Sequence, residues 1–131
     1  MDIQTDNSCI ICGKNNKHGL NVKFTLDKEN KTAFTNVTIG KMFNGYDGIV
    51  HGGIVCALLD EAGFYAARTL DVITVTMSLN TKFKKPTPIN TELYLEGKVL
   101  ERRSRSVITH SKIMLGSNVL AEAKGEFFIK K

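Results

Sequence analysis

The chain of 131 residues contains no tryptophan, two prolines and three cysteines, and it has no long hydrophobic run. The cysteines are odd in number and Cys56 lies within an apolar segment, so the composition argues against a disulfide framework. The scarcity of proline and the lack of any low-complexity tract argue against a long disordered linker. No apolar stretch approaches the ~20 residues that a membrane span requires. The sequence therefore predicts a reduced, soluble protein with no membrane partner.

The first residues also lack the features of a secretory signal. They read Met1-Asp2-Ile3-Gln4, a polar start with neither a basic cluster nor an apolar run. Hydrophobic residues make up 42% of the chain and charged residues 24%, which is ordinary for a globular protein. A chain of this length has room for one core, so we expect a single domain over residues 1–131, located in the cytoplasm.

The excess of positive charge is concentrated in a few places. The formal net charge is +5, and basic residues cluster after residue 81, at a turn near residue 104 and at the C-terminus. These clusters lack interleaved aromatic residues and any nucleic-acid motif, so we expect no nucleic-acid partner. They suit the phosphates of a nucleotide-like ligand, and a solvated basic surface is an equally good interpretation of any single residue among them.

Apolar spacing divides the chain into strands and one helix. After a polar lead-in loop over residues 1–18, alternation predicts a hairpin formed by residues 20–26 and 32–39. Helical spacing follows from Gly53 to about Leu70, with a core stripe of Ile54, Val55, Leu58, Leu59, Ala62, Tyr65 and Ala66. Four more strands are predicted over residues 74–83, 91–101, 106–115 and 119–129. Strict alternation on the first of these four places Thr76 and Asn80 on the same face.

The order of these elements limits the architecture. One helix cannot supply the crossovers of a parallel sheet, and short polar turns between the last four strands predict an antiparallel meander. A six-stranded antiparallel sheet wrapped around one long central helix, which is an α+β domain, is the economical arrangement. An open sheet ends in an exposed edge strand that a second subunit can cover, and residues 74–83 are the candidate. We therefore expect self-association as a homodimer or a dimer of dimers, a homotetramer, with active sites between chains.

The segment from Val50 to Gly63 carries the candidate chemistry. His51-Gly52-Gly53 stands at the start of the helix, where free backbone N–H groups and the helix dipole favour negative charge. Asp60 lies inside the helix away from the core stripe, with small or apolar neighbours on its side. An oxyanion-binding turn and a carboxylate are what ester or thioester hydrolysis needs. Asp60 is therefore the candidate base or nucleophile, and Glu61 receives no role.

Three stretches of the sequence resemble one known family. They are Phe43 to Gly53 with Leu58-Leu59-Asp60-Glu61 behind it, Cys9-x-x-Cys12-Gly13 leading to Gly19-Leu20, and Leu79-Asn80 running to Lys85-Pro86. They are similar to the PaaI-type acyl-CoA thioesterases of the hotdog fold, and the similarity covers most of the chain. The resemblance implies that fold, hydrolysis of an acyl-CoA thioester to free acid and coenzyme A, and no cofactor beyond the coenzyme A of the substrate.

The resemblance also implies roles for single residues. The N–H of Gly53 polarises the thioester carbonyl, Gly52 allows its close approach, and His51 orients the turn or touches the substrate. Asp60 attacks the carbonyl or activates water, and Thr76 holds that water or steadies the carboxylate. An equally good interpretation is that Thr76 has no catalytic role and is present because threonine favours exposed positions in β-strands. Besides Gly52, the substrate-binding residues expected are Asn44, Asn80, Lys84, Lys85, Arg102, Arg103 and Arg105.

The sequence gives less support to three other interpretations. A hotdog protein can hold an acyl-CoA or an acyl carrier without turnover, but a pure binder does not need the set of Gly53, Asp60 and Thr76. A hotdog dehydratase is disfavoured because Met42-Phe43-Asn44-Gly45 lacks the histidine that such enzymes place early in this loop. Cys9 and Cys12 supply two of the four ligands of a structural zinc site, and adding His18 leaves the set incomplete, so no metal is predicted.

Overall fold

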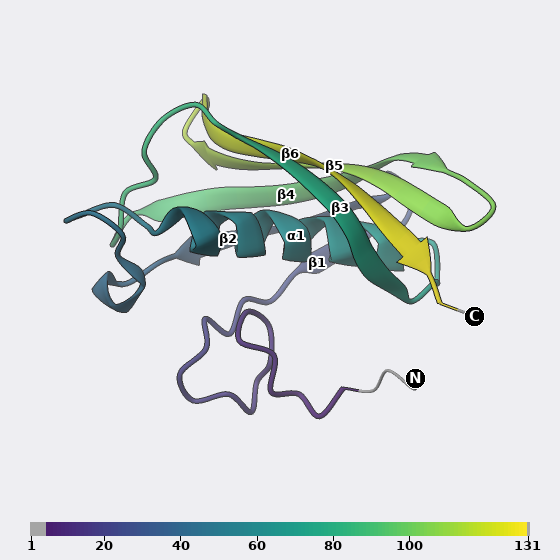
Figure 1. Ribbon diagram of the computed structural model, residues 1–131, viewed down its shortest axis with the longest axis horizontal. Coiled ribbons are helices and arrows are strands. Elements are labelled where there is room, and N and C mark those ends of the chain that lie inside the picture. Colours follow the sequence, from purple (N-terminus) through teal and green to yellow (C-terminus); the bar gives the residue numbers. More distant parts are fainter. Residues whose placement is uncertain (1–4, 131) are drawn as a thin grey trace.

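The computed structural model describes residues 5–130, and within them one long helix lies across a six-stranded sheet (Figure 1). In chain order the elements are β1 (Thr25–Asp27), β2 (Thr32–Thr38), the short 3-10 helix η1 (Lys41–Phe43), α1 (Gly52–Arg68), β3 (Thr74–Phe83), β4 (Glu92–Arg102), β5 (Ser106–Leu115) and β6 (Asn118–Ile129). The sheet order is β1-β2-β4-β5-β6-β3, and neighbouring strands are antiparallel. The predicted α+β hotdog architecture is confirmed.

Helix α1 begins at the glycine pair because His51 caps it. The ring nitrogen Nδ1 of His51 accepts a hydrogen bond from the N–H of Gly53 at 2.9 Å, which satisfies one free donor of the first turn. The helix buries Val55, Leu58, Leu59, Ala62, Gly63, Ala66 and Ala67. A Cβ on Gly63 would stand 2.7 Å from both Phe127 and Thr109, so the sheet reaches further around the helix than the apolar stripe predicts. In residues 5–130, α1 and every other helix fall short of the length and apolarity needed to cross a membrane.

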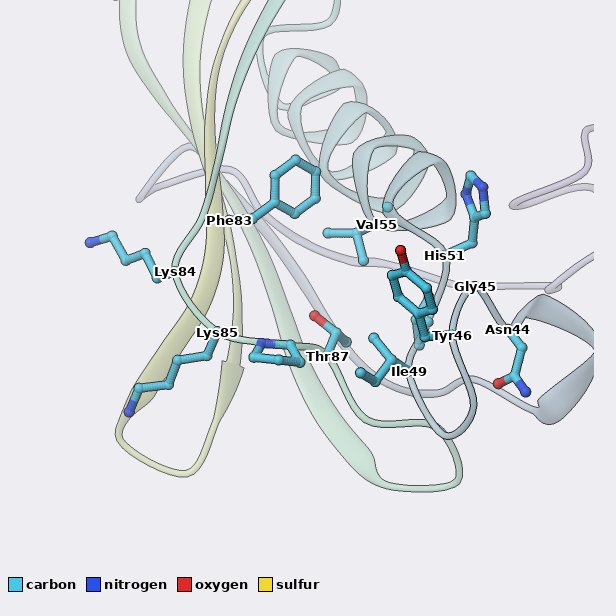
Figure 2. A pocket seen from close by; sticks show the side chains of 13 residues that line it. Asn44, Gly45, Tyr46, Ile49, His51, Val55, Phe83, Lys84, Lys85 and Thr87 are labelled. Atoms are coloured by element: carbon cyan, nitrogen blue, oxygen red, sulfur yellow. The ribbon is translucent and has the colours of Figure 1, made fainter.

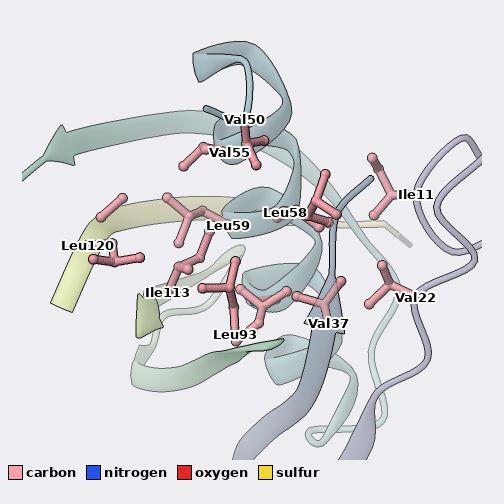
Figure 3. Close-up of a cluster of buried hydrophobic side chains, with 14 of the residues drawn as sticks. Ile11, Val22, Val37, Val50, Val55, Leu58, Leu59, Leu93, Ile113 and Leu120 are labelled. Carbon is pink, nitrogen blue, oxygen red and sulfur yellow. The ribbon is translucent and has the colours of Figure 1, made fainter. Parts of the chain in front are cut away.

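The core lies between α1 and the sheet, and the lead-in segment over residues 5–24 closes the remaining side (Figure 3). Ile11 and Val22 from this segment are only 3% and 5% exposed, and they belong to the same cluster as Leu58 and Leu59. Figure 1 shows the segment on the side of α1 that faces away from the sheet. The helix is therefore covered from two sides. Residues 5–18 of the predicted lead-in loop are a packed part of the domain, and residues 1–4 lie outside the described residues.

The first strand is shorter than its alternation predicts. The N–H groups of Leu20 and Val22 each bond at 2.8 Å to the carbonyls of Ile10 and Ile11 in the lead-in segment, outside the sheet. Asn21 has φ of +51°, in the left-handed region, which interrupts an extended chain. The prediction of a strand over residues 20–26 is wrong for these reasons, and only the hairpin of β1 with β2 remains.

Strand β3 lies at the far edge of the sheet beside β6, and not beside β4. The connection over residues 84–91 passes the N-terminal end of α1, where the N–H of Val50 bonds to the carbonyl of Thr87 at 2.8 Å. Strands β4, β5 and β6 do form a meander. The predicted meander of four consecutive strands is therefore wrong for β3, although β3 is the edge strand that the sequence predicts.

A bulge in β3 changes the face on which its later side chains lie. The register with β6 shifts between Thr76 and Ser78. Thr76 pairs with the buried Phe127 and faces α1, whereas Asn80 pairs with Lys124 and lies on the outer face of the sheet. Strict alternation, which places Thr76 and Asn80 on one face, is therefore wrong because one extra residue in the strand reverses the pattern.

Candidate active site

Asp60 faces strand β3 and is held there by a hydrogen bond. The hydroxyl of Thr76 donates to Oδ1 of Asp60 at 2.6 Å. Asp60 is half-buried. Its carboxylate is therefore held in place by Thr76 and still accessible. The bulge that follows Thr76 leaves this hydroxyl on the helix side of the strand. The structure thus brings together two of the residues that the sequence assigns to catalysis.

Asp60 belongs to a row of residues on α1 that face β3 at intervals of one turn. Gly52, Cys56 and Asp60 are four positions apart, so they lie along one side of the helix. The thiol of Cys56 contacts the hydroxyl of Thr81 at 3.6 Å, and a Cβ on Gly52 would lie 3.8 Å from the ring of Phe83. At 1.5 Å per residue, Gly52 and Asp60 are about 12 Å apart along the helix axis.

The start of α1 offers a different backbone donor from the one that the sequence predicts. The N–H of Gly53 is occupied, because it donates to His51 Nδ1 at 2.9 Å. The N–H of Gly52 has no hydrogen bond to any group in residues 5–130, and Gly52 is exposed. His51 therefore orients the turn, and Gly52 takes the place predicted for Gly53 as the free donor. The choice between the two depends on a side-chain contact that a glycine pair does not reveal.

A pocket of about 780 Å³ opens beside this helix start (Figure 2). Its size is within the range of small-molecule sites. Figure 2 shows the rings of Tyr46 and Phe83 near the first turn of α1. Lys84 and Lys85, which directly follow Phe83, extend outward from the chain after β3. The pocket is lined by Asn44, Gly45, Tyr46, Ile49, Val50, His51, Gly52, Val55, Phe83, Lys84, Lys85, Pro86 and Thr87. Asp60 and Thr76 lie outside this lining, further along α1.

Some of the predicted substrate-binding residues lie at this pocket. Asn44, Gly52, Lys84 and Lys85 line it, and Oδ1 of Asn44 is buried with no hydrogen-bond partner in the described chain. Both lysines reach across to β6, where Lys84 lies 3.3 Å from a carboxylate oxygen of Glu122. The buried Asn44 oxygen is an acceptor that a ligand can satisfy.

The other predicted binding residues are not brought to the pocket. Asn80 lies on the outer face of the sheet, because of the β3 bulge. Arg102, Arg103 and Arg105 lie at the turn between β4 and β5, whereas Lys85 contacts Asn118 beside the turn between β5 and β6. These turns are at opposite ends of β5, about 30 Å apart at the rise of an antiparallel strand. Within a single chain the arginines therefore lie away from this pocket, and their contact with coenzyme A stays a prediction.

Glu61 has a defined position that the sequence does not predict. Cys9 from the lead-in segment donates a hydrogen bond from its thiol to Oε1 of Glu61 at 3.2 Å. Burial raises the pKa of Glu61, and the hydrogen bonds from Cys9 and Cys12 only partly oppose that shift. Burial also raises the pKa of Cys12 to about 12. The contact joins residues 52 positions apart, so it depends on the fold of the lead-in segment.

Comparison with known proteins places the chain in a family. Residues 47–122 match the family model of the thioesterase superfamily. A protein of Saccharolobus solfataricus that is provisionally named an esterase is 36% identical over 85 residues, which is 63% of this chain. Those residues are 56% of the relative, so this chain spans little more than half of that protein's length.

Solved structures share the fold. A crystal structure of a thioesterase superfamily protein has a TM-score of 0.86 at 25% identity, covering 95% of this chain and 61% of the other. The PaaI protein of the Escherichia coli phenylacetic acid degradation operon has a TM-score of 0.72 at 17% identity, covering 78% and 75%. A hypothetical thioesterase of Streptococcus pneumoniae, solved with coenzyme A, has a TM-score of 0.74 at 14% identity, covering 83% and 97%.

Two further structures of the Streptococcus pneumoniae thioesterase carry single alanine substitutions, one of an aspartate and one of a threonine 16 positions later. The family match covers more than half of the present chain, and the solved structures have the same arrangement of one helix and one sheet. The chain belongs to the thioesterase superfamily and has the hotdog fold of its PaaI-type members.

Proposed function

We propose that this protein hydrolyses an acyl-CoA thioester to a free acid and coenzyme A. The observation that carries the proposal is the carboxylate of Asp60, which Thr76 holds by a hydrogen bond. Gly52, whose N–H is free, lies on the same face at the start of α1. Thioester hydrolysis needs a donor for the developing oxyanion and a nucleophile or base, and α1 supplies both. Membership of the thioesterase superfamily supports this reaction class.

The helix start receives the thioester carbonyl. Its oxygen accepts a hydrogen bond from Gly52, where the helix dipole stabilises the charge that develops during attack. The pocket beside Gly52 is lined by Val55, Ile49 and the aromatic rings of Tyr46 and Phe83, which suits an apolar acyl group. The N-cap contact of His51 keeps the turn in the shape that presents this donor.

Asp60 supplies the attack in one of two ways. As a nucleophile it forms an acyl anhydride while the carbon–sulfur bond breaks, and water then hydrolyses the anhydride. As a general base it takes a proton from water while the water oxygen attacks the carbonyl carbon, and the proton passes to the leaving thiolate. In both routes the hydroxyl of Thr76 holds one carboxylate oxygen and leaves the other directed at the reacting groups.

The separation of the two groups along α1 leads to a site made by two chains. Gly52 and Asp60 are about 12 Å apart along the helix axis, whereas donor and attacking group must each lie about 3 Å from the reacting atoms. A two-fold axis beside the free face of α1 brings Gly52 of one chain opposite Asp60 of the other. We therefore propose a homodimer with two equivalent sites, and a dimer of dimers as the larger assembly.

The edge strand supports this assembly. Val75 and Met77 on β3 are 41% and 57% exposed, although they are apolar and lie next to Thr76. An exposed apolar edge is a surface that a second chain covers. Sedimentation analysis at micromolar concentration tests this step, and a monomer would contradict it.

The coenzyme A moiety lies outside the acyl pocket in this proposal. Lys84 and Lys85 extend from the rim of the pocket, where charge-assisted hydrogen bonds to phosphate groups can form (Figure 2). The Streptococcus pneumoniae thioesterase of the same fold was solved with coenzyme A, which supports this ligand class. Its substituted aspartate and threonine have the same spacing as Asp60 and Thr76, which supports the pair as functional.

A thiol-release assay tests the proposed reaction. Purified protein is offered aryl, short-chain, medium-chain and long-chain acyl-CoAs, and the free coenzyme A thiol is measured over time. We expect turnover with at least one of these classes. Tight binding of an acyl-CoA without thiol release from any of them would instead identify a binding module.

A further inference from the structure

Two thiols and a carboxylate meet where the lead-in segment covers α1. The sulfur atoms of Cys9 and Cys12 and a carboxylate oxygen of Glu61 all lie within 4.8 Å of one another, and the three residues are half-buried. The thiols come from the segment before β1 and the carboxylate from the middle of the helix. We propose that these side chains form a Zn²⁺ site, with water as the fourth ligand.

The backbone that carries the two cysteines is folded as a tight turn. The N–H of Ile11 donates to Sγ of Cys9 at 3.4 Å, and the N–H of Gly13 donates to the Cys9 carbonyl at 2.9 Å. A Cβ on Gly13 would lie 2.3 Å from the Cys9 nitrogen, so the turn closes only with glycine there. Two cysteines spaced by two residues on such a turn are the usual half of a zinc-ligand set, and an N–H donated to sulfur stabilises its thiolate.

Glu61 completes a three-ligand set, and its carboxylate has a second oxygen without a partner. Oε1 of Glu61 accepts the Cys9 thiol, while Oε2 is buried and makes no hydrogen bond within residues 5–130. An unpaired buried carboxylate oxygen is unfavourable, and a cation at this point satisfies it. The sequence counts only the cysteine pair and therefore predicts no metal, because it does not place Glu61 beside the pair.

The chemistry of the donors selects the metal. Two thiolates and one carboxylate suit Zn²⁺, whereas Mg²⁺ and Ca²⁺ prefer sets made of oxygen alone. Binding releases the two thiol protons to solvent. A disulfide between Cys9 and Cys12 would use the thiols but leave the buried oxygen of Glu61 without a partner. The metal site accounts for all three side chains.

The site connects the lead-in segment to the residue that follows Asp60. Cys9 and Ile11 pack against the core beside α1, Cys12 lies next to Glu61, and Asp60 faces β3 from the same turn of the helix. Bound Zn²⁺ therefore ties this segment to the helix and raises the thermal stability of the folded chain by mass action.

Titration of the reduced protein of 131 residues with Co²⁺ and then Zn²⁺ tests the site. We expect one equivalent of Co²⁺ to give thiolate-to-cobalt charge-transfer absorption with the visible bands of a tetrahedral ion, and Zn²⁺ to displace it. Competition with a chromophoric chelator gives the affinity. Loss of a ligand in Cys12→Ser or Glu61→Gln should weaken Zn²⁺ binding by at least about tenfold, and the rise in Tm on adding Zn²⁺ should shrink accordingly.

Cys56→Ser is the matched control, because Cys56 is the remaining cysteine and its thiol contacts Thr81 on the β3 side of the helix. Its Zn²⁺ affinity should equal that of the wild type. Glu61→Gln keeps the proposal testable if Cys12→Ser does not fold. Failure of the reduced wild-type protein to bind either metal at micromolar concentration overturns the proposal, as does unchanged affinity in a folded Glu61→Gln variant. Because binding is measured without substrate, either result is independent of the proposed hydrolysis.

Discussion

The hydroxyl of Thr76 donates a 2.6 Å hydrogen bond to the carboxylate of Asp60, from an edge strand to the middle of the helix and across 16 positions of sequence. The contact exists because β3 contains a bulge directly after Thr76, which keeps this hydroxyl on the helix side. A carboxylate held in this way has one oxygen fixed and one available.

Asp60→Asn should abolish most of the turnover. The amide keeps the shape of the side chain and can still bond to Thr76, but it has no charge with which to attack or to accept a proton. We expect kcat to fall by on the order of 10² to 10⁴, while folding, assembly and acyl-CoA binding persist. Thiol release gives kcat, and calorimetry gives binding. Asp71→Asn, at an exposed carboxylate paired with Lys28 beyond the helix, is the control and should be fully active. Wild-type rates in the Asp60 variant would exclude this helix from the chemistry.

Thr76→Val tests the second half of the pair. Valine has nearly the same volume, so the change removes the hydroxyl and little else. A hydrogen bond to a charged group contributes about 1.5–3 kcal/mol, which corresponds to a loss of about ten- to a hundredfold in kcat. Thr76→Ser retains the hydroxyl and should recover most of the activity. If Thr76→Ser is as impaired as Thr76→Val, the methyl group matters and the hydrogen bond is not the cause.

Sequence patterns predict the fold well where local chemistry decides it. The glycine pair after His51 sets the start of α1, and the apolar spacing up to Ala66 sets its inner face. Local patterns do not predict features that depend on pairing between strands distant in the sequence. Nothing in the unbroken alternation from Val75 to Phe83 reveals the bulge, so Asn80 is predicted on the wrong face. The order of strands also depends on the whole sheet, which is why the pairing of β3 with β6 is missed.

The residues of the candidate site can also be separated into those that the sequence identifies and those that only the structure reveals. Asp60 and Thr76 are identified from residue type and family resemblance, and the structure brings them into contact. Gly52, and not the predicted Gly53, has the free N–H because the side chain of His51 turns toward Gly53 and accepts its hydrogen bond. The position of Glu61 depends on how the lead-in segment folds back on α1. These features arise from tertiary contacts between side chains, and periodicity contains no information about them.

Neutralising Lys84 and Lys85 together, as Lys84→Gln with Lys85→Gln, should weaken the binding of coenzyme A. Both side chains are exposed, so each phosphate contact is screened, and we expect KM for acyl-CoA to rise by on the order of tenfold with kcat nearly unchanged. The salt dependence of KM should decrease as well. Replacing Arg102 and Arg105 with Gln is the matched control, because that turn is at the other end of β5. A larger effect on KM from the arginines than from the lysines would reverse the assignment.

Gly52→Pro should remove the oxyanion donor without breaking the helix. Gly52 is the first residue of α1, where proline is tolerated because its φ suits a helix start and that N–H has no intrahelical partner. His51 before it has φ of −55° and ψ of 135°, a conformation that the residue preceding a proline accepts. Loss of one oxyanion donor should reduce kcat by about 10²–10³. Gly52→Ala keeps the N–H, and its Cβ would meet Phe83 at 3.8 Å, an ordinary contact, so it should remain active.

Mixing the two inactive variants should restore activity if each site uses two chains. In a mixed dimer of Asp60→Asn and Gly52→Pro, one site combines the intact Gly52 of the first chain with the intact Asp60 of the second, and the other site has both defects. Random re-association makes half of the dimers mixed, each with one working site, so we expect recovery to about a quarter of wild-type activity. Thiol release is measured after subunit exchange, and each variant alone, treated identically, is the control. If both groups act within one chain, every mixed dimer lacks a complete site, and activity stays at the level of the single variants.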